Sequence, residues 1–182
     1  MAIIKSMKLK GFKSFAKPLE LQFGKGFNCI IGPNGSGKSN VMDALCFVLG
    51  KLSAKSMRAE KSSNLIFNGG KKGSPQKEAE VSIIFSNDNQ EFPVDTDELK
   101  LTRVIKNTGN SVYKINDQVL TRQQILEVLA AGKIDPDGHN IILQGDIVRF
   151  MEMRPMQRKE LIEEIAGISI YEDKKNKAMS SL

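Results

Sequence analysis

Tryptophan is absent from this 182-residue chain, histidine occurs once, and cysteine occurs twice. Cys29 and Cys46 lie in apolar segments without a neighbouring cysteine or histidine at metal-ligand spacing, which argues against a zinc site or a disulfide framework. We therefore expect both to be small buried residues of a cytosolic protein. The sequence has no run of eighteen apolar residues and no secretory signal at its start, so we expect no membrane span.

The overall composition is that of a globular domain. Hydrophobic residues make up 40% of the chain and charged residues 26%, and the length suffices to bury a core. Lysine and arginine number 27 against 21 acidic residues, a net charge of +6. This charge is compatible with a nucleic-acid partner but does not require one.

Hydrophobic periodicity predicts the secondary structure. Residues that alternate between apolar and polar predict strands over 3–10, 19–23, 79–85, 99–105 and 112–115. Two continuous apolar runs, 27–31 and 141–143, predict strands that are covered on both faces. Helical spacing predicts a helix over 41–49, the Thr121–Gln124 pair forms a capping box for another, and Pro155 suits the first turn of a third. Residues 51–77 read as a long irregular insertion over the surface.

The clearest motif is the glycine-rich loop that follows the apolar run 27–31. Residues 32–39 read Gly-Pro-Asn-Gly-Ser-Gly-Lys-Ser and match the P-loop pattern G-x-x-x-x-G-K-[ST]. Its backbone N–H groups would cradle phosphate oxygens, assisted by the positive end of the following helix. The residues expected to bind nucleotide are Gly32, Pro33, Asn34, Gly35, Ser36, Gly37, Lys38 and Ser39. Lys38 would contact the β- and γ-phosphates of ATP, and Ser39 would ligate Mg²⁺.

The acidic residue that hydrolysis requires at the end of a second strand is missing. The best candidate run is 81–88, where the acid comes three residues too late, and neither Asp43 nor Asp146 follows such a strand. The P-loop alone therefore leaves the catalytic half of the site unspecified.

Four segments resemble the SMC family (structural maintenance of chromosomes), most closely its prokaryotic or archaeal chromosome-partition type. They are Gly11-Phe12-Lys13-Ser14-Phe15, the P-loop continued by Asn40, Leu143-Gln144-Gly145-Asp146, and the run 154–167. The resemblance extends from about residue 3 to residue 175. It implies an α/β fold with a mixed sheet: the P-loop core of an ABC-type ATPase combined with an antiparallel β subdomain. Residues 1–168 would be the N-terminal lobe of a head, and 169–182 the truncated start of a coiled-coil arm.

The resemblance also implies the missing parts and the partners. In this family a C-terminal lobe supplies the Walker B acids, the signature motif and the D-loop, and a second SMC chain (a homodimer) completes the site. Kleisin, accessory subunits and DNA are the other expected partners. ATP and Mg²⁺ are the expected cofactors, in a nucleoid-associated protein whose heads engage on ATP binding and open on hydrolysis. The fragment alone is expected to be essentially inactive.

Further site residues follow from the resemblance, position by position. Gln144 matches the Q-loop glutamine that contacts Mg²⁺ and the attacking water, and Arg58 matches the R-loop arginine that reaches phosphate. Asn40, which continues the P-loop, is also expected to bind nucleotide. Lys13 and Ser14 match residues beside the base or α-phosphate, and Ser63 with Asn64 would line the base or ribose. Without the resemblance, Gln144 would read as a polar residue leaving a buried strand, Arg58 as a solvated cation on a surface loop, and Lys13 as a surface charge at a strand end.

Three alternatives remain open at the level of sequence. A repair ATPase of the RecN or RecF kind shares the P-loop logic, although the run 154–167 argues against it. A small-molecule P-loop kinase would need an acceptor pocket and lid arginines, which we do not find. A non-enzymatic, nucleotide-gated interaction module is the third alternative.

Overall fold

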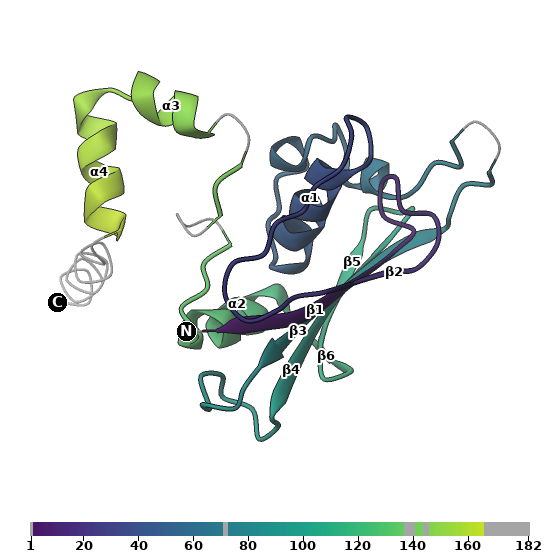
Figure 1. Ribbon diagram of the computed structural model, residues 1–182, viewed down its shortest axis with the longest axis horizontal. Helices are drawn as coiled ribbons and strands as arrows, with labels where there is room; N and C mark the ends of the chain where they lie inside the picture. The colour runs from purple at the N-terminus through teal and green to yellow at the C-terminus, as the bar shows by residue number, and fades with distance from the viewer. Residues whose placement is uncertain (1, 71–72, 137–140, 144–145, 166–182) are drawn as a thin grey trace, which may run out of the picture. The chain divides into compact units, whose positions relative to one another are not determined.

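The computed structural model describes residues 2–70, 73–136, 141–143 and 146–165. The chain divides into two compact units, Met1–Pro136 and Asp137–Leu182. The first unit contains the sheet, the P-loop and two α-helices, and the second contains two further helices (Figure 1).

A six-stranded antiparallel sheet forms the first unit, in the order β2-β1-β3-β4-β5-β6 (Figure 1). Its strands are β1 (Ile3–Lys10), β2 (Leu19–Gln22), β3 (Glu78–Ser86), β4 (Glu98–Lys106), β5 (Ser111–Ile115) and β6 (Gln118–Leu120). The first five confirm the strands predicted from alternation. The sixth was not predicted, because its three residues are too few to show a period. It follows a tight turn at Asn116 and Asp117, both of which have positive φ.

Alternation along the strands places one row of side chains in the core. Met7, Leu9, Ile83 and Leu101 are 2% exposed or less, and burial of each such side chain contributes about 1.5–3 kcal/mol. Helix α1 (Lys38–Val48) packs against β3 and β4, and α2 (Arg122–Ala131) packs against β5.

Both predicted helices of this unit are confirmed. Helix α1 buries Val41, Ala44 and Phe47 at helical spacing. Helix α2 begins with the predicted capping box, in which the Thr121 side chain accepts from Gln124 N and the Gln124 side chain accepts from Thr121 N.

The segment 51–77 is irregular as predicted but is not a surface insertion throughout. It contains two short 3₁₀ helices, η1 (Lys55–Met57) and η2 (Ser62–Leu65). Met57 and Leu65 are each 1% exposed, and Phe67 N donates to Gly11 O at 2.8 Å. The apolar residues of this segment therefore anchor it to the loop that follows β1.

Two predicted strands are wrong. Residues 27–31 form no strand, with Phe27 94% and Ile31 85% exposed, and 141–143 form none, with Ile142 62% exposed. A buried strand needs a pairing partner and cover on both faces. The described residues supply neither, since the sheet β2-β1-β3-β4-β5-β6 includes neither segment and both segments carry exposed apolar side chains. Cys29 is accordingly exposed, contrary to expectation, whereas Cys46 is buried.

The second unit contains α3 (Asp146–Glu152) and α4 (Pro155–Ile165). The helix predicted at Pro155 is confirmed. Helix α3 was not predicted; the carboxylate of its first residue, Asp146, accepts a hydrogen bond from Leu143 N at 2.7 Å and so contacts the segment that precedes the helix. The predicted arm at 169–182 and the Gln144 side chain lie outside the described residues.

Candidate nucleotide-binding site

The P-loop leads directly into α1. Gly35 and Gly37 adopt φ values of 81° and 97°, which favour glycine. A Cβ atom at Gly37 would lie 3.0 Å from Ser14 Oγ and 3.2 Å from Phe15 Cζ. Glycine at this position therefore serves both the backbone turn and the close approach of the loop that follows β1.

The Lys38 side chain folds back onto the first residues of the P-loop. Its Nζ donates to Gly32 O at 2.6 Å and to Pro33 O at 2.8 Å. Ser39 is exposed on the first turn of α1. A cation and a hydroxyl at the positive end of a helix form an arrangement suited to phosphate oxygens and a magnesium ion.

Four of the other predicted residues meet beside this loop. Asn40 Nδ2 donates to Ser14 Oγ at 2.9 Å, and Arg58 Nη2 donates to Asn40 Oδ1 at 3.3 Å. Lys13 directly precedes Ser14 in the loop that follows β1. Three segments that are distant in sequence thus place Lys13, Ser14, Asn40 and Arg58 around the start of α1.

Sequence analysis missed the residue that joins this group. Asp43, on α1, is 3% exposed, and its Oδ2 accepts from Lys13 Nζ and from Arg58 Nη2, each at 2.5 Å. By sequence, Asp43 is only an acidic residue that does not follow a buried strand. A carboxylate within the apolar face of a helix was the available signal, since a buried carboxylate requires a cationic partner.

Lys13 and Arg58 also share an unusual backbone conformation. Their φ values are 48° and 54°, in the left-handed region that side chains other than glycine adopt at a cost of about 1–3 kcal/mol. The ion pairs with Asp43 help to offset this cost.

Ser63 and Asn64 lie on η2, where they line a shallow hollow of about 420 Å³ with Phe67, Gln76 and Asn107. Leu65 links this segment to the group around α1, since its carbonyl accepts from Lys13 N at 2.7 Å. Ser63 and Asn64 are thus linked to Lys13 through the backbone hydrogen bond of Leu65, but the hollow that they line includes neither Lys13 nor any P-loop residue.

The other end of α1 is fixed by two arginines. Arg103, on β4, donates from Nη1 to Phe47 O at 2.8 Å and to Lys51 O at 2.9 Å. Arg122 Nε donates to Gly50 O at 2.8 Å. Cations at the negative end of a helix are favourable, and the two arginines tie the C-terminal end of α1 to β4 and α2.

The Arg103 guanidinium is stacked between the rings of Phe47 and Tyr113, 4.1 Å and 4.8 Å from their centroids. Burial lowers the pKa of Arg103 and raises the pKa of Tyr113. Within the described residues, Arg103 Nε and the Tyr113 hydroxyl have no hydrogen-bond partner. This cation–π stack is structural, because it holds the end of α1 remote from the P-loop.

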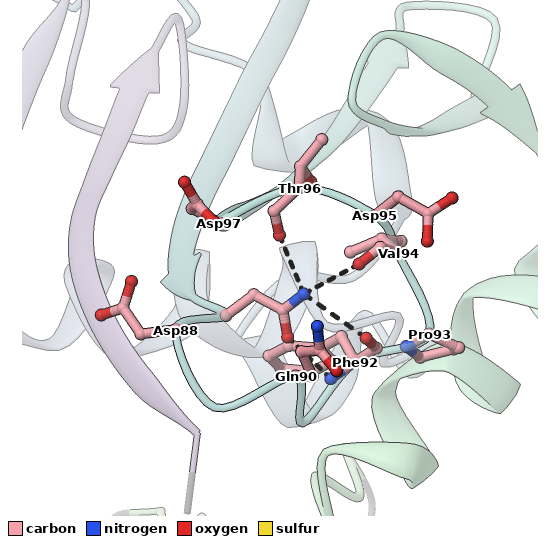
Figure 2. Close-up of a pocket in the computed structure, with 9 residues that line it drawn as sticks. Asp88, Gln90, Phe92, Pro93, Val94, Asp95, Thr96 and Asp97 are labelled. Atoms are coloured by element: carbon pink, nitrogen blue, oxygen red, sulfur yellow. Dashed lines mark hydrogen bonds between the residues drawn. The ribbon is translucent and has the colours of Figure 1, made fainter.

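A second hollow, of about 410 Å³, lies in the loop between β3 and β4 (Figure 2). The buried Asn87 amide donates to Phe92 O, Val94 O and Thr96 O, as the dashed lines in Figure 2 show. Asp88, Asp95 and Asp97 surround it, but the described residues include no group of His, Cys, Asp or Glu that could hold a metal ion. We assign this hollow to loop architecture.

The comparisons with known proteins agree with this geometry. Residues 3–177 match the family model described as "RecF/RecN/SMC N terminal domain". The chain is 50% identical to the chromosome partition protein Smc of Pyrococcus furiosus over 183 residues, which span all of this chain and 16% of that relative.

Solved structures give the same result at the level of the fold. A structure described under "Structural biochemistry of ATP-driven dimerization and DNA stimulated activation of SMC ATPases" is 49% identical, with a TM-score of 0.84, and covers 89% of this chain and 98% of its own. The Smc head of Pyrococcus furiosus with an extended coiled coil, bound to the C-terminal domain of ScpA, is 49% identical with a TM-score of 0.89. That match covers all of this chain and 46% of the other. The expected fold class, the N-terminal lobe of an ABC-type head, is thereby confirmed.

Proposed function

Because the chain belongs to the RecF/RecN/SMC family and has the fold of an SMC head lobe, we propose that it binds MgATP as one half of an SMC ATPase site. The observation that carries this proposal is the P-loop at the start of α1, with Lys38 against its carbonyls and Asn40, Arg58 and Lys13 beside it.

The described residues divide the work of binding. Lys38 would exchange its bonds to Gly32 O and Pro33 O for bonds to the β- and γ-phosphates, and the Ser39 hydroxyl would ligate Mg²⁺. Mg²⁺ usually takes few protein ligands and completes its shell with phosphates and water, so one hydroxyl at this position fits. Gln144 is proposed as a further Mg²⁺ contact. Lys13 and Ser14 are proposed beside the base or α-phosphate, and Ser63 and Asn64 beside the base or ribose.

Hydrolysis, in this proposal, requires the C-terminal lobe. The chain spans 16% of the length of the Pyrococcus furiosus relative, and we propose that Walker B, the signature motif and the D-loop lie in the remainder. The exposed apolar side chains of Phe27, Ile31 and Ile142 support a partner that supplies strands beside 27–31 and 141–143. The chain alone would then bind ATP and turn it over negligibly.

The whole protein would act on DNA as a pair of heads joined to coiled-coil arms, for chromosome condensation and segregation. A second SMC chain, a kleisin with accessory subunits, and DNA are its proposed partners, and residues 169–182 would begin the arm. The description of one similar structure names ATP-driven dimerization and DNA-stimulated activation, and the other is bound to ScpA. Among the helices that the structure describes, none has the length and hydropathy needed to span a bilayer.

The test measures nucleotide binding and turnover separately. We expect calorimetry to detect MgATP binding by the chain, and Lys38→Ala to weaken it at least about tenfold, because the charged contact to phosphate is lost. ATP turnover should appear only after the C-terminal lobe is added. Lys100→Ala removes a half-buried lysine of β4 that pairs with Asp117 on the β5–β6 turn, and it should leave binding unchanged.

Robust turnover by the chain alone would contradict the split-site proposal. Equal ATP affinity of wild type and Lys38→Ala would contradict the assignment of the P-loop.

A further inference from the structure

The carboxylate of Asp43 is the buried centre of the group beside the P-loop. Its side chain is 4% exposed, and one of its oxygens, Oδ2, contacts both the Lys13 ammonium and the Arg58 guanidinium. Two cations therefore compensate one buried anion, and either alone would suffice to pair it.

The two cations are held differently. The Lys13 side chain is 11% exposed, and its Nζ donates a second bond to Met57 O. The Arg58 side chain is 46% exposed, and its further bond goes to Asn40 Oδ1 at 3.3 Å. Lys13 is thus the fixed counterion of Asp43, and Arg58 is the exchangeable one.

Arg58 also lies within reach of the P-loop. Asn40, which accepts from it, directly follows Ser39 on the first turn of α1. A guanidinium keeps its charge at any pH that a folded protein tolerates and binds carboxylate and phosphate by the same geometry. Asp43 and a nucleotide phosphate must therefore compete for Arg58.

We propose that Asp43 is a positioning residue that holds Arg58 back from the phosphates until nucleotide binds, when Arg58 leaves Asp43 and Lys13 remains to compensate it. This inference rests on the proposed nucleotide site. Opening the Asp43–Arg58 ion pair takes up part of the binding free energy, so the pair lowers the apparent affinity for ATP. The Asp43–Arg58 ion pair would thus be closed without nucleotide and open when phosphate is bound.

A double-mutant cycle tests this proposal. Asp43→Asn keeps the shape of the side chain and removes its charge, and we expect it to raise ATP affinity about fivefold or more, within the range of typical coupling energies. In an Arg58→Ala background the same change should have no effect on affinity, because no arginine remains to be released. Calorimetry on the four proteins measures the difference.

Asp117→Asn is the matched control for charge. It also removes one negative charge, from an exposed residue on the β5–β6 turn that pairs with Lys100 at 3.2 Å, and it should leave ATP affinity unchanged. A general electrostatic effect of Asp43 on an anionic ligand would instead persist in the Arg58→Ala background.

Asp43→Asn leaves Lys13 without its carboxylate and can unfold the chain, so a measurement on wild type complements the cycle. Arginine side-chain NMR, with the Arg58 signal assigned by Arg58→Lys, should show that signal shifting when MgATP is added. An Arg58 signal unmoved by saturating ATP, or an Asp43→Asn effect of equal size with and without Arg58, would overturn the proposal. Failure of wild type to bind ATP at all would instead overturn the nucleotide site itself.

Discussion

At the scale of single residues, two buried charged side chains determine how helix α1 is held in this lobe. Asp43 and Arg103 are 3% and 5% exposed, and both act on α1. Asp43, at the middle of α1, is compensated by two cations, whereas Arg103 is satisfied by backbone carbonyls and aromatic rings at the C-terminal end of the helix. The helix that follows the P-loop is thus positioned at its middle and at its C-terminal end by buried charged groups, which could not be left unpaired without a large cost.

The stack around Arg103 predicts an unusual titration of Tyr113. Burial raises the pKa of Tyr113 above its ordinary value of 10.0, so the folded state keeps this proton where the unfolded state loses it. Its contribution to stability is therefore complete below pH 10 and is lost as the pH rises through the folded-state pKa. Absorbance titration near 295 nm should show one phenol ionising above pH 10 in the folded chain.

Tyr113→Phe identifies that phenol and tests its cost. The late component should vanish from the titration, and the free energy of unfolding at neutral pH should change by less than about 1 kcal/mol, because the hydroxyl has no described partner to lose. Persistence of the late component in Tyr113→Phe would refute the assignment.

At the scale of elements, the sequence predicts a helix or strand correctly where the determining interactions join residues a few positions apart. The capping box of α2, the helix α1 after the glycine-rich loop and the alternating strands were all predicted and are all confirmed. These features depend on neighbours along the chain, which a sequence displays directly.

Elements that depend on distant partners were not predicted correctly. Residues 27–31 carry the composition of a buried strand, yet they form no strand, because nothing in the described residues pairs with them. Asp43 was missed for a related reason: its partners Lys13 and Arg58 are 30 and 15 residues away. Composition indicates that a residue requires a partner, but only the tertiary structure supplies that partner's identity.

The capping box gives a prediction at the scale of the helix. Thr121→Ala removes the acceptor for Gln124 N and should lower the free energy of unfolding by about 1 kcal/mol, as measured by urea denaturation. Thr121→Ser keeps the hydroxyl and should lose much less. Equal losses in the two variants would show that the Thr121 methyl group, and not the cap, stabilises α2.

At the scale of the whole molecule, the sheet of the first unit is formed entirely by its own strands, whereas the segment that precedes the P-loop has no partner among the described residues. Its six strands pair among themselves, and its core is closed by α1 and α2. The P-loop, however, follows a segment with fully exposed apolar side chains. An apolar run of this kind is unfavourable in water unless another surface covers it, and the proposed C-terminal lobe is the partner that we expect to cover it.

This incompleteness predicts where the lobes meet. Replacing Phe27 and Ile31 together by serine removes two side chains that are 94% and 85% exposed, so the isolated chain should keep its stability within about 0.5 kcal/mol. Its affinity for the C-terminal lobe should fall at least about tenfold, because about 1.5–3 kcal/mol of burial is lost for each side chain. Val119→Ser, which alters an exposed apolar residue on β6, should change neither quantity.

Hydrogen exchange adds a structural readout: amides of residues 27–31 should exchange freely in the chain alone and become protected when the C-terminal lobe binds, because strand pairing would give them the hydrogen bonds that they lack. Protection already present in the isolated chain would contradict this assignment, and so would unchanged lobe affinity in the double variant.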